Sequence, residues 1–421
     1  MTHEVVEVCA GAGGQAIGLE RAGFEHALAV EIDSHACATL RQNRPEWKVA
    51  EGDAADRDLW TPSDYEGVSL LAGGVPCPPF SIAGKQLGAS DERDLFAWAV
   101  ELCVNEVKPR ALLLENVRGL SMPRFAAYRQ HVLDRLATAG YVGDWRLLHA
   151  SDFGVAQLRP RFVLVALKEE DAPYFRWPEP DDMRLTVGEA LRDLMGANGW
   201  PHVDDWVQLA NDIAPTLVGG SKKHGGADLG PTRAKRAWRE LGVDALGVAN
   251  EAPGPESPHP NVQLPKLTVQ MVARLQGWQD AWGWQLSGRK TAQYRQVGNA
   301  FPPPLAEAVG RSIMSALERV GQPHDMPELA SASLHDPVYR VLKEADDFLT
   351  PAAILSRLAV PYDPIKLERR VAHLRKDFVI ELKETKSGPA YKLGEFRAFI
   401  GQEEHGRHEA FSDRTGRSRI S

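Results

Sequence analysis

The sequence predicts an α/β protein whose largest domain is built on a doubly wound sheet. Short apolar runs at residues 68–72 and 111–114 have the composition of buried parallel strands. A further run at residues 4–9 leads into a glycine-rich turn and then a helical stretch over 15–22. Reactive side chains stand directly after these runs, and open α/β sheets bind ligands at the carboxyl ends of their strands.

Length and composition narrow the class of protein. A chain of 421 residues is too long for one typical core, so two or three domains are expected. Hydrophobic residues make up 43% and charged residues 25%, which is ordinary for a soluble globular protein. No apolar run approaches the ~20 residues that span a bilayer, and no signal-peptide pattern opens the chain, so a cytoplasmic location is expected.

The cysteines and the net charge exclude some classes and leave others open. The four cysteines form no CxxC pair, which argues against a disulfide framework or a zinc cluster and for a reducing compartment. No metal site is predicted. The net charge is −8, yet a nucleic-acid partner is not excluded, because a local basic cleft governs phosphate binding.

Cys77 follows the predicted strand at 68–72 in a loop that reads Gly-Gly-Val-Pro-Cys-Pro-Pro. The glycines end the strand, and the prolines fix the backbone around the thiol. A lone loop cysteine is usually a small buried residue. However, Glu115 stands directly after the run at 111–114. If both runs are parallel strands of one sheet, the thiol and the carboxylate emerge at the same edge as a candidate catalytic pair.

A second group of residues suggests a nucleotide-like ligand. The turn at residues 10–14 lets the backbone approach a ligand closely, although a glycine-rich turn alone is equally compatible with a simple tight turn. Glu31 ends the predicted strand at 26–30, about 20 residues after the turn, where a carboxylate would bind ribose hydroxyls. Asp53 follows another short strand at 48–50.

These motifs resemble those of the DNA (cytosine-5)-methyltransferases. The likeness covers nearly all of residues 4–315, with the motifs in the family's order. It includes Pro-Cys with Phe-Ser, Glu-Asn-Val, the run Gln-Leu-Arg-Pro-Arg at 157–161, Arg-Leu-Gln-Gly-Trp at 274–278, and Gln-Val-Gly-Asn-Ala-Phe-Pro at 296–302. Each motif is weak alone, but the ordered set is specific. The resemblance implies a Rossmann-like methyltransferase sheet.

The resemblance assigns catalytic roles to four residues. Cys77 would be the nucleophile and Glu115 its acid partner, while Arg161 would contact O2 of the base and Arg159 would support the site. Two arginines two positions apart in a strand point to the same side, so Arg159 and Arg161 can converge on one anionic target. The residues alone would indicate surface charges, and only the resemblance places both arginines in the active site.

The same resemblance implies S-adenosylmethionine as cofactor. The glycine turn would hold its methionine end, Glu31 its ribose and Asp53 its adenine amine. The full set of expected contacts is Cys9, Gly11, Ala12, Gly14, Glu31, Ile32, Asp53, Pro76, Asn299 and Ala300. The family usually has Phe at the position of Cys9 and a large apolar residue, often Trp, at that of Ile32. Both normally pack on the adenine, so a different arrangement there is expected.

The substrate implied by the resemblance is a cytosine flipped out of duplex DNA. Residues 168–266 are rich in Pro, Gly and Trp and carry basic side chains, which alone would indicate a solvated loop. In the family this region is the target-recognition domain. Expected substrate contacts are Ser81, Asn116, Gln157, Lys222, Lys223 and Arg233. A monomer is expected, in a restriction-modification system with a cognate endonuclease.

The expected domain organisation is a split one, with an additional C-terminal unit. The catalytic domain comprises 1–167 and 267–319, the recognition domain 168–266, a linker 320–335, a winged-helix-like unit 336–394 and a disordered tail 395–421. In the third helix of that unit, Lys366, Arg369, Arg370, His373 and Lys376 share one face. This face suits a DNA-reading helix, and equally a protein-docking or merely solvated surface.

Two other functions remain as alternatives. One is the family's tRNA-methylating branch, which the long recognition region disfavours, since that branch has a short one. The other is an inactive methyltransferase fold that serves as a DNA-binding regulator. The presence of Cys77, Glu115 and Arg161 argues against it.

Overall fold

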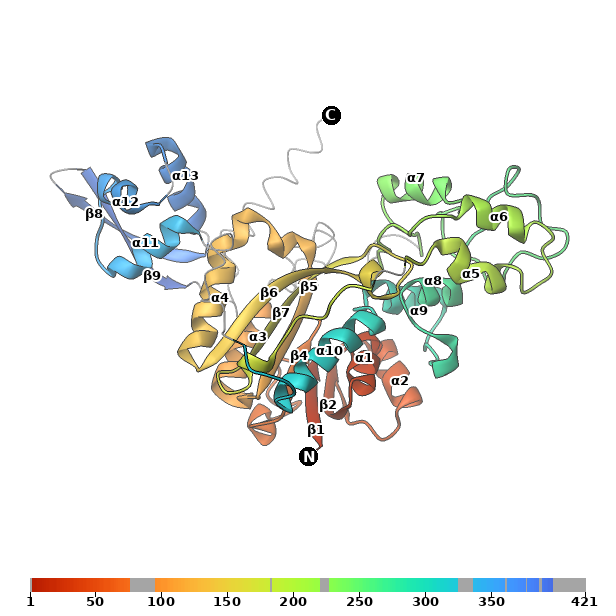
Figure 1. Cartoon of the computed structure of the whole chain (residues 1–421), viewed down its shortest axis with the longest axis horizontal. Coiled ribbons are helices and arrows are strands. Elements are labelled where there is room, and N and C mark those ends of the chain that lie inside the picture. The colour runs from red at the N-terminus through yellow and green to blue at the C-terminus, as the bar shows by residue number, and fades with distance from the viewer. Residues whose placement is uncertain are drawn as a thin grey trace.

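The centre of the molecule is a seven-stranded sheet in the order β3-β2-β1-β4-β5-β7-β6 (Figure 1). The computed structural model describes residues 2–75, 95–181, 184–219, 227–324, 336–359, 362–375, 377–385 and 388–396. The strands are β1 (His3–Val8), β2 (Phe24–Glu31), β3 (Val49–Glu51), β4 (Leu70–Gly73), β5 (Ala111–Val117), β6 (Tyr141–His149) and β7 (Pro160–Lys168). β1 to β5 are parallel, and β7 runs antiparallel to both β5 and β6. The predicted α/β class and mostly parallel sheet are confirmed.

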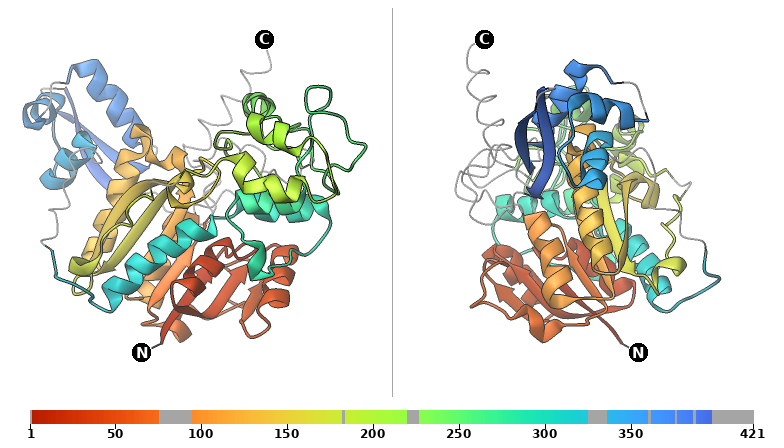
Figure 2. Two further views of the ribbon diagram at one scale, coloured as in Figure 1. Left: turned by 45° about the vertical axis from the view of Figure 1, so that its right-hand side comes forward. Right: turned by 90° about the vertical axis from the view of Figure 1, so that its left-hand side faces the viewer.

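Helices cover both faces of this sheet (Figure 2). Along β1, Val6 and Val8 pack on one side with α3 (Leu95–Leu102) and α4 (Ala126–Thr138), whereas Val5 packs on the other with α1 (Gly14–Arg21) and α10 (Pro303–Leu317). This alternation follows from the two-residue period of a strand. α2 (Ser34–Asn43) lies beside α1, and its N-cap Asp33 accepts hydrogen bonds from two backbone N–H groups. The helix α3 continues into a π-helical turn, Cys103–Val107.

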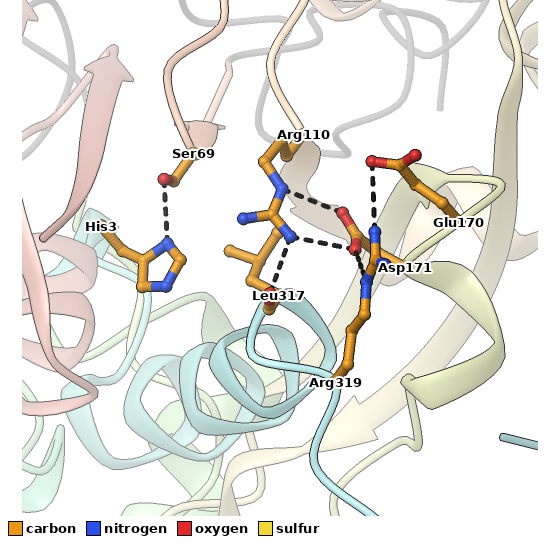
Figure 3. A network of polar contacts seen from close by, with 7 residues as sticks. All are labelled: His3, Ser69, Arg110, Glu170, Asp171, Leu317 and Arg319. Carbon is orange, nitrogen blue, oxygen red and sulfur yellow. Dashed lines mark hydrogen bonds and ion pairs between the residues drawn. The ribbon is translucent and has the colours of Figure 1, made fainter. Parts of the chain in front are cut away.

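The helix α10 is tied to the amino-terminal edge of the sheet by a buried carboxylate (Figure 3). Asp171 is fully buried and accepts hydrogen bonds from Arg110 at 2.9 and 3.0 Å and from Arg319 at 3.0 Å. Arg110 also donates to the carbonyl of Leu317 at 2.7 Å. Residues far apart in sequence therefore hold the sheet together at the edge opposite its carboxyl ends.

A second hydrophobic core lies in the region after β7, shown on the right of Figure 1. It is formed by α5 (Val187–Met195), α6 (Val203–Leu209), α7 (Thr232–Glu240), α8 (Val269–Leu275) and α9 (Lys290–Asn299). Trp206 and Trp238 are its largest fully buried side chains. The sequence assigns α8 and α9 to the catalytic domain, but their apolar faces pack into this core. The helix α9 was not predicted from the sequence.

The C-terminal unit consists of three helices and an antiparallel hairpin. These are α11 (Pro337–Ala345), α12 (Pro351–Arg357), α13 (Pro364–Leu374), β8 (Phe378–Thr385) and β9 (Gly388–Phe396). Asp336, Thr350 and Asp363 each cap a helix through their side chains, and proline follows each cap. The predicted linker overlaps residues 325–335, and the predicted tail residues 397–421, which lie outside the described part.

The C-terminal unit packs on α4, at the left of Figure 1. The Tyr339 hydroxyl donates a hydrogen bond of 2.7 Å to Asp134, and Lys343 forms an ion pair with the same carboxylate. The His131 ring stacks on Phe396 with 4.0 Å between ring centroids. In the described residues, no helix is long and apolar enough to cross a membrane.

Candidate active site

A cavity of about 990 Å³ lies at the carboxyl edge of the sheet. Strand β1 pairs with both β2 and β4, so the direction of the crossovers reverses beside it, and that is where open α/β sheets bind ligands. The cavity is lined by twelve of the predicted site residues: Cys9, Gly11, Ala12, Gly14, Glu31, Ile32, Asp53, Glu115, Asn116, Arg161, Asn299 and Ala300. The fold therefore brings residues from positions 9–161 and from positions 299–300 to one site.

Five predicted site residues lie outside the described part of the chain. They are Pro76 and Cys77, Ser81, and the basic pair Lys222 and Lys223. Their roles stay predictions. The described chain before Cys77 ends at Val75, which is buried and whose carbonyl accepts a hydrogen bond of 3.1 Å from the Asn116 side chain. Asn116, predicted as a substrate contact, thus holds the backbone that leads into the cysteine loop.

The turn after β1 adopts left-handed backbone conformations. Cys9, Gly11 and Gly13 have φ values of 54°, 58° and 94°, a region that glycine enters without strain. Trp284, from the segment between α8 and α9, donates a hydrogen bond of 3.0 Å from its indole to the carbonyl of Ala12. A Cβ on Gly13 would lie 2.5 Å from this ring, so only glycine fits there. No local sequence signal pointed to Trp284, because its partner lies 272 residues away.

Glu31 braces the glycine turn against the start of α2. One carboxylate oxygen accepts from the Gly11 N–H at 2.8 Å and the other from the Asp33 N–H at 2.7 Å. Burial raises the pKa of Glu31, and these backbone hydrogen bonds oppose the rise. Beside it, the Ile32 side chain is 66% exposed although it is large and apolar. An apolar surface at the mouth of a cavity is suited to packing against a ligand ring.

Glu115 and Arg161 form a buried ion pair on the cavity wall. Glu115 lies on β5 and Arg161 on the adjacent antiparallel strand β7. Glu115 stands opposite Val163, two residues along β7 from Arg161. Both are 7% exposed. Burial lowers the pKa of the Arg161 guanidinium, and the Glu115 carboxylate counteracts this effect. The pair presents a carboxylate and a cation side by side to whatever enters the cavity.

Arg159 does not share the target of Arg161, contrary to the sequence expectation. It precedes β7 with a φ of 22°, so the alternation of a regular strand does not apply. Its guanidinium is fully buried and donates to the carbonyls of Leu217, Gly298 and Ala300 at 2.9, 2.9 and 2.6 Å. Arg159 therefore joins the segment at Leu217 to the end of α9 at the cavity.

Gln157 is likewise part of this junction and does not contact solvent. It is fully buried, and its amide donates to the side chain of Gln276 at 2.6 Å and to the carbonyl of Leu275 at 3.1 Å. Its carbonyl oxygen accepts from the Leu217 N–H at 2.8 Å. Gln157 thus has a structural role in this junction, and its contact with DNA stays a prediction. The remaining predicted contact, Arg233, is exposed on α7 and does not line the cavity.

His202, Asp205 and His259 form a cluster in the region after β7, with potential ligand atoms within 4.8 Å of one another. A hydrogen bond links two of its members, His259 and Asp205, and the His202 ring packs edge-on against the His259 ring. The Asn261 N–H donates to Nδ1 of His259 at 3.1 Å, so the ring proton is on Nε2, which lies 3.3 Å from the Asp205 carboxylate. None of these three residues lines the cavity.

Sequence reasoning missed several residues that line the cavity. They are Gln15, Gly74, Arg118, Ser121, Met122, Arg295 and the segment 216–219. Gln15 directly follows the glycine turn, and Gly74 lies in the run that leads to Cys77. Both residues could therefore have been predicted from their positions in the sequence. The segment 216–219 reaches the cavity through Arg159 and the α9 end, which no local pattern encodes.

Known proteins are similar to this chain over most of its length. The family model described as C-5 cytosine-specific DNA methylase matches residues 3–315. The chain is 63% identical over 409 residues to the Type II methyltransferase M.NaeI of Lentzea aerocolonigenes, with 97% of each chain covered. It is 51% identical over 323 residues to the Type II methyltransferase M.NgoMIV of Neisseria gonorrhoeae, covering 76% of this chain and 99% of the relative.

Among solved structures, DNMT2 of Spodoptera frugiperda covers 74% of this chain and 100% of its own, with a TM-score of 0.51 and 16% identity. This likeness shows the fold alone. The family match and the two Type II relatives decide the rest: the chain belongs to the C-5 cytosine-specific DNA methylases and is a DNA (cytosine-5)-methyltransferase.

Proposed function

We propose that this enzyme methylates a cytosine turned out of a specific duplex site, with Cys77, Glu115 and Arg161 acting on the base. The observation that carries the proposal is the buried Glu115–Arg161 pair on the cavity wall. A Cβ on Gly74, three residues before Cys77, would lie 3.4 Å from Oε2 of Glu115. The backbone leading to the cysteine loop therefore passes directly beside the carboxylate.

The cavity fits S-adenosylmethionine, the cofactor that methyltransferases of this family imply. Its volume lies in the range of small-molecule sites. Glu31 and Asp53 supply carboxylates at the ends of β2 and β3, where ribose and adenine amino groups would be bound. Each oxygen of Glu31 accepts one backbone N–H, which leaves lone pairs for ribose hydroxyls. Ile32 offers an apolar surface for the adenine.

The residues of the chain would make cytosine C5 reactive. C5 is a poor nucleophile until a thiolate adds to C6, which is the role of Cys77. Glu115 would hold a proton at N3 and contact the exocyclic amine, while Arg161 would contact O2. The bound cofactor supplies an electrophilic methyl group to C5. Loss of the C5 proton and elimination of Cys77 then complete the reaction.

Access to C5 and C6 requires that the base leave the duplex, at a cost of a few kcal/mol. The recognition region would repay this cost through contacts to the flanking DNA, and it would also choose the site. The Type II names of both relatives support a role in a restriction-modification system, with a cognate endonuclease as partner. The tRNA-methylating and regulatory alternatives are not favoured, since both relatives are Type II methyltransferases.

A duplex that contains 5-fluorocytosine tests this chemistry. Fluorine cannot leave C5 as a proton does, so the final elimination is blocked and the enzyme should stay covalently attached. On a denaturing gel we expect an adduct that requires both the cofactor and the fluorinated site. The same duplex with ordinary cytosine is the control and should be methylated and released. Active methyl transfer without any adduct would rule out the covalent mechanism.

We further propose that the C-terminal unit is a winged-helix-like module whose helix α13 reads DNA. Lys366 and Arg369 are exposed on α13, while Leu367, Val371 and Leu374 form its buried face. One residue of the predicted basic face has a structural role instead. Arg370 forms an ion pair of 2.8 Å with Asp336, the buried N-cap of α11.

Reversing the charge of Lys366 and Arg369 to Glu is expected to weaken DNA binding and reduce its salt dependence. Each lost phosphate contact lowers the slope of log affinity against log salt by about 0.9. Gel-shift titrations at several salt concentrations measure both effects. Arg357→Glu, on the neighbouring helix α12, is the matched control. If a folded double variant keeps the wild-type affinity and slope, α13 does not read DNA and protein docking is the better account.

A further inference from the structure

Gln15 is a buried polar residue whose side chain has no partner within the described residues. It is the second residue of α1, is 3% exposed and lines the cavity. Neither Nε2 nor Oε1 of its amide has a hydrogen-bond partner there. Most buried side-chain amides in proteins are hydrogen-bonded, because leaving one unpaired is destabilising. An unpaired amide in a cavity wall therefore points to a ligand.

The position of the amide identifies which part of a ligand it meets. A Cβ on Gly74 would lie 3.8 Å from Oε1 of Gln15 and 3.4 Å from Oε2 of Glu115. The Gln15 amide and the Glu115 carboxylate therefore flank the same glycine, at the end of β4. Glu31 and Asp53 follow β2 and β3, on the other side of β1 in the sheet order. Gln15 thus lies near the reacting centre and away from the proposed ribose and adenine contacts.

We propose that the Gln15 carboxamide binds the amino-acid end of S-adenosylmethionine. Nε2 would donate to the α-carboxylate, and Oε1 would accept from the α-ammonium. A carboxamide offers one donor group and one acceptor, and a zwitterionic amino acid carries a charged partner for each. Hydrogen bonds to charged groups are stronger than neutral ones, so this pairing satisfies the amide well. The inference rests on the proposed cofactor site.

Calorimetric titration of the full chain tests the inference with two ligands. S-Adenosylmethionine carries the amino-acid end, whereas 5′-methylthioadenosine lacks it. In Gln15→Leu we expect the affinity for S-adenosylmethionine to fall about tenfold, and the affinity for 5′-methylthioadenosine to stay within about twofold of wild type. The unliganded variant should melt at the wild-type temperature or above it, because leucine of similar size replaces an unpaired amide.

Gln42→Leu is the matched control. Gln42 is exposed on α2, and its amide donates to Gln285 outside the cavity. The Gln42→Leu variant should bind both ligands with wild-type affinity. Equal S-adenosylmethionine affinity in wild type and Gln15→Leu would overturn the inference. A parallel loss for both ligands would also overturn it, since the amide would then act on the adenosine part. Wild-type protein that binds neither ligand would instead reject the proposed cofactor site.

Discussion

Replacement of Cys77 by serine is expected to abolish methyl transfer while DNA binding stays close to wild type. Serine has nearly the size of cysteine, but its hydroxyl is a far weaker nucleophile toward C6 than a thiolate. Loss of a nucleophile of this kind lowers turnover by at least about 10³-fold. Transfer of labelled methyl groups to duplex DNA measures the first effect, and gel-shift titration the second.

Cys103→Ala is the matched control for the loss of a thiol. Cys103 is fully buried, and burial raises the pKa of its thiol to about 12, so it is no thiolate at neutral pH. Burial also raises the pKa of Cys37 to about 12. Cys103→Ala should keep wild-type turnover per folded molecule. Turnover at the wild-type level in Cys77→Ser would remove Cys77 from its proposed role.

Glu115→Gln is expected to lower methyl transfer by about 10²–10⁴-fold, the usual contribution of general acid–base catalysis. Glutamine keeps the size of the side chain and can still accept a hydrogen bond from Arg161, but it cannot hold a transferable proton at N3. The variant should also melt at a lower temperature, because the buried Arg161 loses the carboxylate that balances its charge. Single-turnover methyl transfer and thermal melting measure the two effects.

Glu7→Gln separates the chemical effect from the cost of losing a buried carboxylate. Glu7 is fully buried on β1, burial raises its pKa, and it pairs with His26 at 3.1 Å outside the cavity. This control should alter stability but keep turnover per folded molecule. If Glu115→Gln loses no more turnover than Glu7→Gln, the carboxylate acts only in folding.

Local sequence patterns were sufficient to place the site on the sheet. Apolar runs predicted the strands, and the residues that follow them, Glu31 and Glu115, line the cavity as expected. In the C-terminal unit, a capping side chain and the proline after it mark the start of each helix. In each case the deciding interactions lie within a few residues, because strand ends and caps are fixed by the neighbouring backbone.

The roles of other residues were decided only by the tertiary structure. The three carbonyls bound by Arg159 lie 58, 139 and 141 residues away in the sequence, and Arg370 pairs with Asp336 across the C-terminal unit. The same holds for Trp284 on the glycine turn and for the unpaired amide of Gln15. The sequence alone thus determined the family, the sheet and the carboxylates at its edge. Which buried polar groups are paired depends on segments that meet only after folding, so long-range packing decided it.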